Sequence, residues 1–222
     1  MKKVTRGVEP QVLRNNKSKW QRNFINEVKR NRGYKGMNAA IKNKYNQPEI
    51  KRALKEMYSG KCCYCENCIG TEGYENIEHL KPKSLSRFHM LAFSWENLHW
   101  CCQRCNTCKN DKWNRHYPIL DPTKDNPENH IKIDTITGKI VYKTRRGKTT
   151  INHAQLNREG LVNARKRILI KLNDIFLMIR NTPSINDNRY LLKLLNDFIN
   201  DDAEFSALIK GYINENSSLL KI

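Results

Sequence analysis

Eight cysteines fall in two short runs, at residues 62–68 and 101–108, and the rest of the chain has none. Within each run the cysteines are spaced as C-x-x-C, which is typical of zinc ligands and also of thioredoxin-like redox pairs. A redox motif needs one such pair opening a helix after a strand, whereas here two pairs lie 40 residues apart. We therefore expect a zinc ion held by four thiolates, a closed structural site with no open position for a substrate.

A second set of side chains lies between and within the cysteine runs: Glu78, His79, Asn97 and Asn106. A carboxylate and an amide carbonyl are hard oxygen ligands, which suit Mg²⁺ or Mn²⁺ better than they suit zinc. The imidazole beside Glu78 can take a proton from water at neutral pH. A divalent ion and a base are the parts needed to hydrolyse a phosphodiester.

Lys109 is a further candidate at the end of the second run. If a helix begins near Asn106, Lys109 and Asn110 lie on the same face of that helix one turn later. The Lys109 ammonium group could then hold the scissile phosphate, so we count it with the catalytic candidates.

The charge of the chain is strongly positive and unevenly distributed. The formal net charge is +19; residues 1–60 carry 16 Lys and Arg against 4 Asp and Glu, while residues 174–222 carry 5 against 7. Such a charge predicts a polyanionic partner at the N-terminal end, although basic side chains can also simply solvate helical faces. No stretch approaches 18 apolar residues, and the first residues lack the apolar region of a signal peptide. We expect a cytoplasmic protein with reduced cysteines and no membrane contact.

Helical periodicity precedes the first cysteine run. Trp20, Phe24 and Val28 are spaced at i, i+4 and i+8, which predicts a short basic amphipathic helix over residues 17–30. A second helix is expected from Pro48 to the Ser59-Gly60 pair, because proline favours the first helical position. This helix leads directly into the first cysteine run.

Beyond the second cysteine run, the sequence pattern predicts first strands and then helices. Residues 131–143 alternate apolar and polar on either side of Thr137-Gly138, which predicts a β-hairpin, and the following "KTRRGK" is expected to be a basic loop tip. A long helix is expected from about Leu156. Thr182-Pro183-Ser184 should end it, and two more helices should follow.

Four segments, "CCYC", "EHLKPK", "WENL" and "CQRCN..K", together resemble the HNH nuclease motif in its zinc-knuckle form. Proteins of that superfamily fold the motif as a ββα-metal finger. The resemblance implies that Glu78 and Asn106 bind the catalytic metal, that His79 is the general base, and that Asn97 helps to orient His79. Asn106 stands where the family usually has a histidine, which bears on metal preference.

Longer stretches resemble one branch of that superfamily. The opening "KKVTRGVEP", the helix before "GKCCYCE" and the segment "ILDPTKDNPENHI" are similar to PtuB-type HNH subunits of Septu phage-defence systems and to their counterparts in retron systems. The likeness spans most of residues 1–170. It implies a companion ABC/SMC-like ATPase of the PtuA type and the destruction of nucleic acid during infection. We expect DNA as the substrate and RNA as the alternative, and the sequence does not decide between duplex DNA, single strands and a structured RNA such as tRNA.

The same family resemblance implies which cysteines bind zinc, namely Cys62, Cys65, Cys102 and Cys105. Two competing C-x-x-C registers, 65/68 and 105/108, stay open because Cys68 and Cys108 are correctly spaced to take part. We expect Cys63 and Cys101 to pack as small buried thiols.

The sequence thus predicts a mostly helical α+β protein with a central ββα-metal finger stapled by a four-cysteine zinc site. We expect a basic helical segment over residues 1–60, the metal-finger core over 61–120, an irregular segment with a hairpin over 121–155 and a helical region over 156–222. Two functional classes fit, a metal-dependent nuclease and a non-catalytic zinc-stapled module that only binds nucleic acid. The oxygen and imidazole groups of Glu78, His79, Asn97 and Asn106 favour the nuclease, since a zinc-ribbon binder does not need them.

Overall fold

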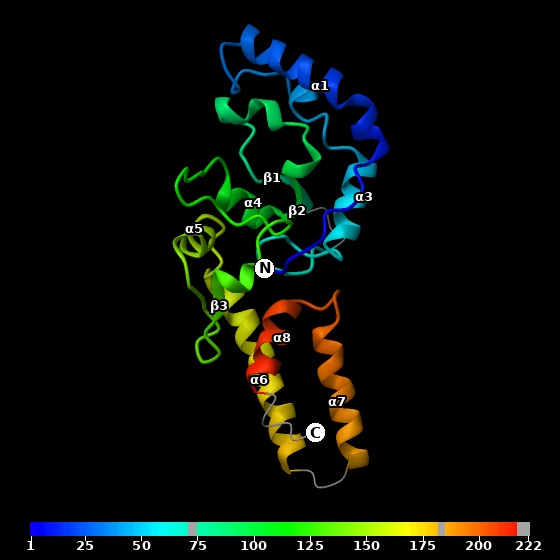
Figure 1. Cartoon of the computed structure of the whole chain (residues 1–222), viewed down its shortest axis with the longest axis vertical. Coiled ribbons are helices and arrows are strands. Elements are labelled where there is room, and N and C mark those ends of the chain that lie inside the picture. Colours follow the sequence, from blue (N-terminus) through cyan, green and yellow to red (C-terminus); the bar gives the residue numbers. More distant parts are fainter. Residues whose placement is uncertain (71–74, 182–184, 217–222) are drawn as a thin grey trace.

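The molecule is elongated, with a mixed α and β part above a three-helix part in the view of Figure 1. The computed structural model describes residues 1–70, 75–181 and 185–216, and the side chains of residues 185–188 are not described. The expected helix break at Thr182-Pro183-Ser184 therefore lies outside the described residues. Among those residues the strands form two antiparallel two-stranded sheets, so the protein is a mostly helical α+β structure, as the sequence predicts.

The centre of the mixed part is an antiparallel strand pair followed directly by a helix. Strand β1 (Glu75–His79) pairs with β2 (Leu98–Cys102), and α4 (Gln103–Lys109) follows β2 without an intervening loop. Helix α4 contacts both strands. Most residues of the two strands are buried, so the ends of β1 and the start of α4 are held firmly against one another.

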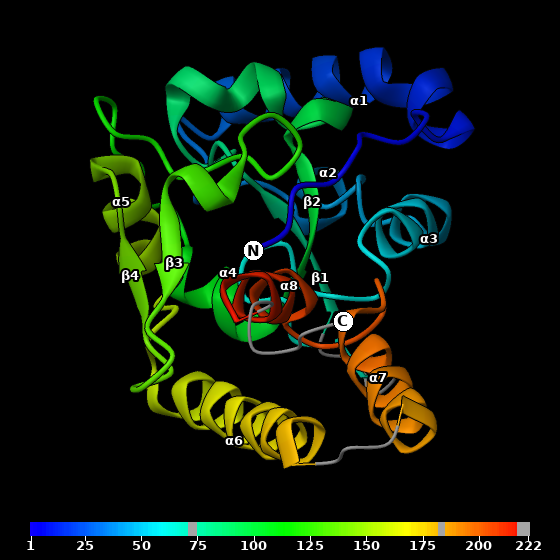
Figure 2. The same cartoon turned by 60° about the horizontal axis from the view of Figure 1, so that its bottom comes forward.

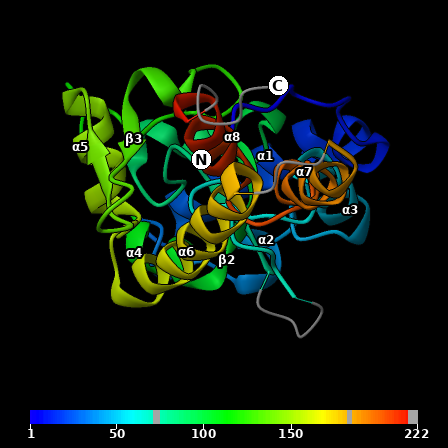
Figure 3. The ribbon, with the colours of Figure 1, turned by 90° about the horizontal axis from the view of Figure 1, so that it is seen from below.

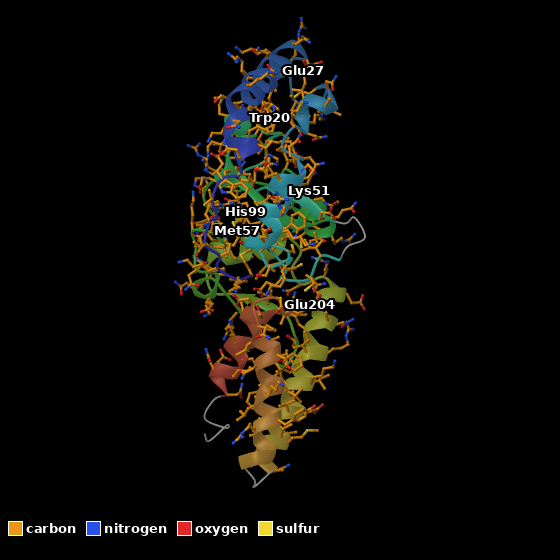
Figure 4. The ribbon with its side chains drawn as sticks, turned by 90° about the vertical axis from the view of Figure 1, so that its right-hand side faces the viewer. Trp20, Glu27, Lys51, Met57, His99 and Glu204 are labelled. Carbon is orange, nitrogen blue, oxygen red and sulfur yellow. The ribbon has the colours of Figure 1, made fainter. Side chains whose placement is uncertain are left out.

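Three helices precede this centre: α1 (Gln11–Arg30), α2 (Ala39–Lys42) and α3 (Pro48–Met57). Helix α1 begins at Gln11 rather than at residue 17, because Pro10 occupies its N-cap position and Leu13 adds a fully buried contact to its apolar face. The expected helix from Pro48 is confirmed, and positive φ angles at Ser59 and Gly60 follow its end. Figure 4 shows the labelled Trp20 and Glu27 on α1 above Lys51 and Met57 on α3.

The hairpin expected around Thr137-Gly138 is also present, as strands β3 (Ile131–Ile133) and β4 (Ile140–Tyr142). The expected basic loop tip after it is wrong, because "KTRRGK" opens helix α5 (Arg145–His153). The Thr144 hydroxyl accepts a hydrogen bond from the Gly147 N–H at 3.2 Å and so caps the helix. Gly147 packs so closely on the His130 carbonyl oxygen that a Cβ atom would overlap it.

The C-terminal part consists of α6 (Glu159–Asn181), α7 (Ile185–Ile199) and α8 (Ser206–Glu215). Helix α8 lies between the long pair α6–α7 and the mixed part (Figures 1 and 2). Seen from below, β3 and α5 lie on the side opposite α3 (Figure 3). Within the described ranges, no helix combines the length and hydrophobicity needed to cross a membrane.

Helix α8 is anchored on the first cysteine run. The buried Lys61 ammonium donates to the Ala203 carbonyl at 2.9 Å and to the Ser206 hydroxyl at 2.7 Å, and the Phe205 N–H donates to the Glu66 carbonyl at 3.3 Å. The two parts of the molecule are therefore joined by specific polar contacts. Three short 3-10 helices complete the described elements: η1 (Ser86–Leu91), η2 (Trp95–Asn97) and η3 (Pro127–Asn129).

Candidate metal centres and catalytic cavity

Four cysteines from the two runs converge next to the start of α4. The sulfur atoms of Cys62, Cys65, Cys102 and Cys105 all lie within 4.8 Å of one another. The Cys102 sulfur accepts the Cys105 N–H at 3.4 Å and thereby caps α4. This cluster could hold a metal ion such as zinc, and its members are the four cysteines that the family resemblance selects.

The remaining cysteines lie outside this four-sulfur cluster. The Cys68 thiol donates to the Asp202 carbonyl at 3.5 Å, and the Cys108 thiol donates to the Gln155 side-chain carbonyl at 3.1 Å. The alternative registers 65/68 and 105/108 are therefore not brought together among the described residues. Cys63 and Cys101 are buried, as expected for small packed thiols, and form an overlapping triad with Cys62.

Two sulfurs of the cluster favour the thiolate and two favour the thiol, since hydrogen bonding with Cys102 raises the pKa of Cys65 and of Cys105. Burial opposes ionisation of Cys62, but hydrogen bonds from neighbouring thiols hold the pKa of this group well below its usual value. Hydrogen bonding from Cys101 is the main reason that the pKa of Cys102 is lowered to about 4. Arg158 adds a cationic donor, since its Nη1 lies 3.4 Å from the Cys105 sulfur. Donors of this kind orient metal-binding thiolates and stabilise their charge, and no sequence pattern had pointed to Arg158.

A second candidate centre opens onto a cavity of about 620 Å³ beside β1 and α4. Its wall includes Glu78 and His79 at the end of β1, and Asn106 on the first turns of α4. The ββα arrangement thus brings together on one cavity three residues that are separated by up to 28 positions in the chain. Asn97 and Lys109 do not line this cavity.

Glu78 is buried with two partners. Its Oε1 accepts the Tyr64 hydroxyl at 3.1 Å and forms an ion pair with the Lys109 ammonium. Burial raises the pKa of Glu78, and the neighbouring Lys109 acts in the opposite direction. Lys109 is itself fully buried and also donates to the His79 main-chain carbonyl. The role predicted for Lys109 at a substrate phosphate would therefore require this ion pair to open.

His79 is held in one orientation and one tautomer. Its Nε2 lies 2.9 Å from the Ala92 carbonyl oxygen. Because a carbonyl oxygen can only accept, Nε2 carries the hydrogen and Nδ1 keeps its lone pair. Burial, reinforced by the positive charge of Lys83, holds the pKa of His79 well below its ordinary value. The imidazole is accordingly neutral near pH 7, which is the state that a general base requires.

Asn97 fastens the chain that follows His79. Its Oδ1 accepts the Lys81 N–H at 2.8 Å, while its Nδ2 donates to the carbonyls of Lys81 at 3.0 Å and Leu91 at 3.1 Å. Leu91 immediately precedes Ala92, whose carbonyl holds the His79 ring. The three hydrogen bonds thus fix both the segment after His79 and the segment that orients its imidazole.

The donor types on the cavity wall fit a hard divalent cation. Glu78 offers a carboxylate, and Asn106 offers an amide oxygen. Among the described residues, the groups of three or more His, Cys, Asp or Glu near enough to share an ion are cysteine clusters. An ion at Glu78 would consequently have few protein ligands and would keep water or substrate oxygens, which is usual for Mg²⁺.

Two further residues of the cavity wall, Lys83 and Tyr45, have no role among the sequence predictions. The Lys83 ammonium donates to the Tyr45 hydroxyl at 2.9 Å and lies 4.3 Å from the centre of the Tyr45 ring. Burial lowers the pKa of Lys83 to about 8. The Tyr45 ring in turn packs edge to face against His79, with 4.6 Å between ring centres. Lys83 stands in the quoted "EHLKPK" segment, but no motif or periodicity singled out Tyr45.

A cysteine cluster that could hold a metal ion, beside a strand pair and its following helix, defines a mostly helical α+β protein. No family model matches the chain. It is 40% identical over 114 residues to Septu protein PtuB of Bacillus thuringiensis, covering 51% of this chain and 43% of that protein. It is 31% identical over 157 residues to Septu protein PtuB of Bacillus mycoides (strain KBAB4), covering 56% and 52% respectively.

The chain is therefore homologous to Septu protein PtuB, a component of the Septu defence system. It spans about half the length of these curated relatives. It is also 23% identical over 194 residues to Septu protein PtuA of Bacillus mycoides (strain KBAB4), covering 75% of this chain and 26% of that protein.

Proposed function

We propose that this protein is a metal-dependent HNH endonuclease that hydrolyses phosphodiester bonds as the effector of a Septu-type antiphage defence system. One observation carries the nuclease assignment. Glu78, His79 and Asn106 share the wall of a single cavity, and the Nδ1 atom of His79 is left free to accept a proton. The homology to proteins named Septu protein PtuB supports the role in defence.

The chemistry follows from the state of His79. Its Nδ1 takes a proton from a water molecule while the water oxygen attacks phosphorus, and the phosphorus bond to the leaving oxygen breaks. Asn97 and the Ala92 carbonyl keep the imidazole aligned during this transfer. A divalent ion supplies neutralisation of phosphate charge when bound, and Glu78 and Asn106 are the residues that would hold it.

The test is cleavage of plasmid DNA, single-stranded DNA and total tRNA in Mg²⁺ or Mn²⁺. His79→Ala should slow cutting by about 100- to 10,000-fold, the usual contribution of a general base. Zinc content should stay at the wild-type value, and cutting is compared at a temperature at which both proteins are folded, because His79 is buried and its loss removes packing. His116→Ala is a matched control, since His116 is exposed and does not line the cavity. Full activity of His79→Ala would refute the assignment.

We also propose that an ABC/SMC-like ATPase of the PtuA type is the partner. Support comes from the homology to PtuB, because the relatives PtuB and PtuA are both named as Septu proteins. Co-expression of this chain with the ATPase should yield a complex that survives size-exclusion chromatography in high salt. Separate elution of the two proteins at every salt concentration would contradict the pairing.

One observation favours the alternative of a zinc-stapled module that binds nucleic acid without cutting it. The Glu78 carboxylate is already satisfied by Lys109 and Tyr64, so it does not depend on a metal ion for a partner. This alternative predicts salt-sensitive binding of nucleic acid and no cutting in any divalent metal. It also predicts that wild type and His79→Ala bind equally well.

A further inference from the structure

The candidate reacting groups lie in a recess rather than on a ridge. Glu78 and His79 are only 2% and 5% exposed, and the cavity through which they are reached measures about 620 Å³. That volume is in the range of sites that enclose one small ligand. A nucleotide within a stacked duplex cannot enter such a recess unless it leaves the stack, whereas a nucleotide of a single strand can.

The cavity wall offers aromatic rings for stacking. Tyr34 and Tyr45, both from the chain before the cysteine runs, line the same cavity as His79. Each ring has a lysine ammonium over it, with Lys42 at 4.5 Å from the Tyr34 ring centre and Lys83 at 4.3 Å from that of Tyr45, so a base that stacks on Tyr34 uses the face that Lys42 does not cover. Rings that can stack on bases, beside cations that can meet phosphates, are the combination used to bind single strands.

Polar groups of the wall suit a base and its phosphate. An amide side chain can both donate to and accept from a base edge. Five asparagines line the cavity: Asn43, Asn46, Asn76, Asn106 and Asn110. The two carboxylates of the wall are each offset by a cation, because Glu75 pairs with Lys51 at 3.4 Å and Glu78 pairs with Lys109. Repulsion of a phosphate by these carboxylates is thereby reduced.

We propose that this cavity is a binding site for one unpaired nucleotide, and that the substrate is therefore a single-stranded stretch of polynucleotide. Tyr34 stacks on the base, the asparagines meet its polar edge, and Lys83 meets the phosphate next to His79. The part of this inference that concerns cleavage rests on the proposed nuclease function. The binding of an unpaired nucleotide does not, and it can be tested separately.

The binding test needs no divalent metal. Fluorescence anisotropy compares one labelled 12-nucleotide sequence as single-stranded DNA, as single-stranded RNA and as a blunt duplex, at one salt concentration. Tyr34→Ala should weaken binding of the single strands about tenfold, since loss of a stacked ring has an effect of this order. Binding of the duplex should change by less than twofold. The DNA and RNA arms identify which strand the site takes.

Further variants separate stacking from folding. Tyr34 also packs on Phe24, with 6.1 Å between ring centres, so Tyr34→Phe should restore most of the single-strand affinity. Asn46→Ala removes an exposed wall side chain and should weaken single-strand binding about fivefold. Tyr142→Ala is the matched control, because Tyr142 is 55% exposed on β4 and does not line the cavity. Equal losses on single strands and duplex in the Tyr34→Ala and Asn46→Ala variants would overturn the site.

The cleavage test uses a hairpin with a long single-stranded tail in Mg²⁺ or Mn²⁺. Cuts confined to the tail support the inference, and cuts at equal rates in the stem refute it while leaving the nuclease assignment intact. If neither part is cut, the nuclease proposal fails, and the anisotropy results still decide whether the cavity holds an unpaired nucleotide.

Discussion

The buried ion pair between Glu78 and Lys109 gives a sharp test of the site's energetics. Replacing Lys109 with methionine keeps much of the side-chain volume but leaves the Glu78 carboxylate without its cation. The Lys109 side chain is fully buried and that of Glu78 is 3% exposed, so solvent can compensate very little. Breaking a buried pair in this way destabilises proteins by about 3–5 kcal/mol. For a chain of this size we expect the melting temperature to fall by about 6–20 °C.

The loss should depend on pH in a defined direction. In the wild-type protein Lys109 counteracts the burial that raises the pKa of Glu78. Without Lys109 this pKa rises further, so the folded variant holds a proton that the unfolded chain releases. A raised carboxyl pKa weakens stability as pH rises. The difference between Lys109→Met and wild type should therefore be largest at neutral pH and shrink as the pH approaches the ordinary range of a glutamate.

The assay is urea unfolding at several pH values, without chelator or added Mg²⁺ so that the cysteine site is undisturbed. A double-mutant cycle with Glu78→Gln should give a coupling free energy of about 2–3 kcal/mol. Lys112→Met is the matched control, because Lys112 is exposed just beyond α4 and should matter by less than about 0.5 kcal/mol. A Lys109→Met loss below about 1 kcal/mol with no coupling would show that the pair is not formed in solution.

Three further outcomes follow from the structure. Arg158→Ala should lower zinc affinity about 10- to 100-fold in chelator competition, whereas Arg167→Ala on the exposed face of α6 should not. Affinity for single-stranded oligonucleotide should fall as pH rises through about 8, because the pKa of Lys83 lies there and its ammonium is lost above it; Lys83→Arg should remove that pH dependence. Gly147→Ala should cost about 1–3 kcal/mol in urea unfolding, since its methyl group overlaps a main-chain carbonyl oxygen, while Gly160→Ala, which meets open space, should not destabilise.

Local signals explain the parts of the fold that the sequence predicts well. Proline at the first position of α3 and the turn at Thr137-Gly138 act within a few residues, so their consequences can be read directly from the chain. The start of α5 was missed because a basic stretch with little apolar content resembles a loop. Its signal was the capping Thr144, whose contribution depends on the Gly147 N–H that it accepts.

The candidate site was predictable only where spacing carries the information. The four clustered cysteines and the pair Glu78-His79 could be named from motif and resemblance. The partners that surround them come from distant segments: Lys109 reaches Glu78 from the end of α4, and Tyr45 reaches His79 from the turn between α2 and α3. Contacts of this kind depend on packing in three dimensions, which no local pattern encodes.

The contacts between α8 and the first cysteine run can form only late in synthesis, after the cavity residues have been made. The candidate cavity is built from residues 34–110, but Lys61 reaches its partners only when Ala203 and Ser206 have left the ribosome. At about 5–20 residues per second, the cavity precedes the anchor by roughly 5–20 s. A nascent chain would thus have formed the candidate cavity while the contacts that hold α8 on the first cysteine run are still absent.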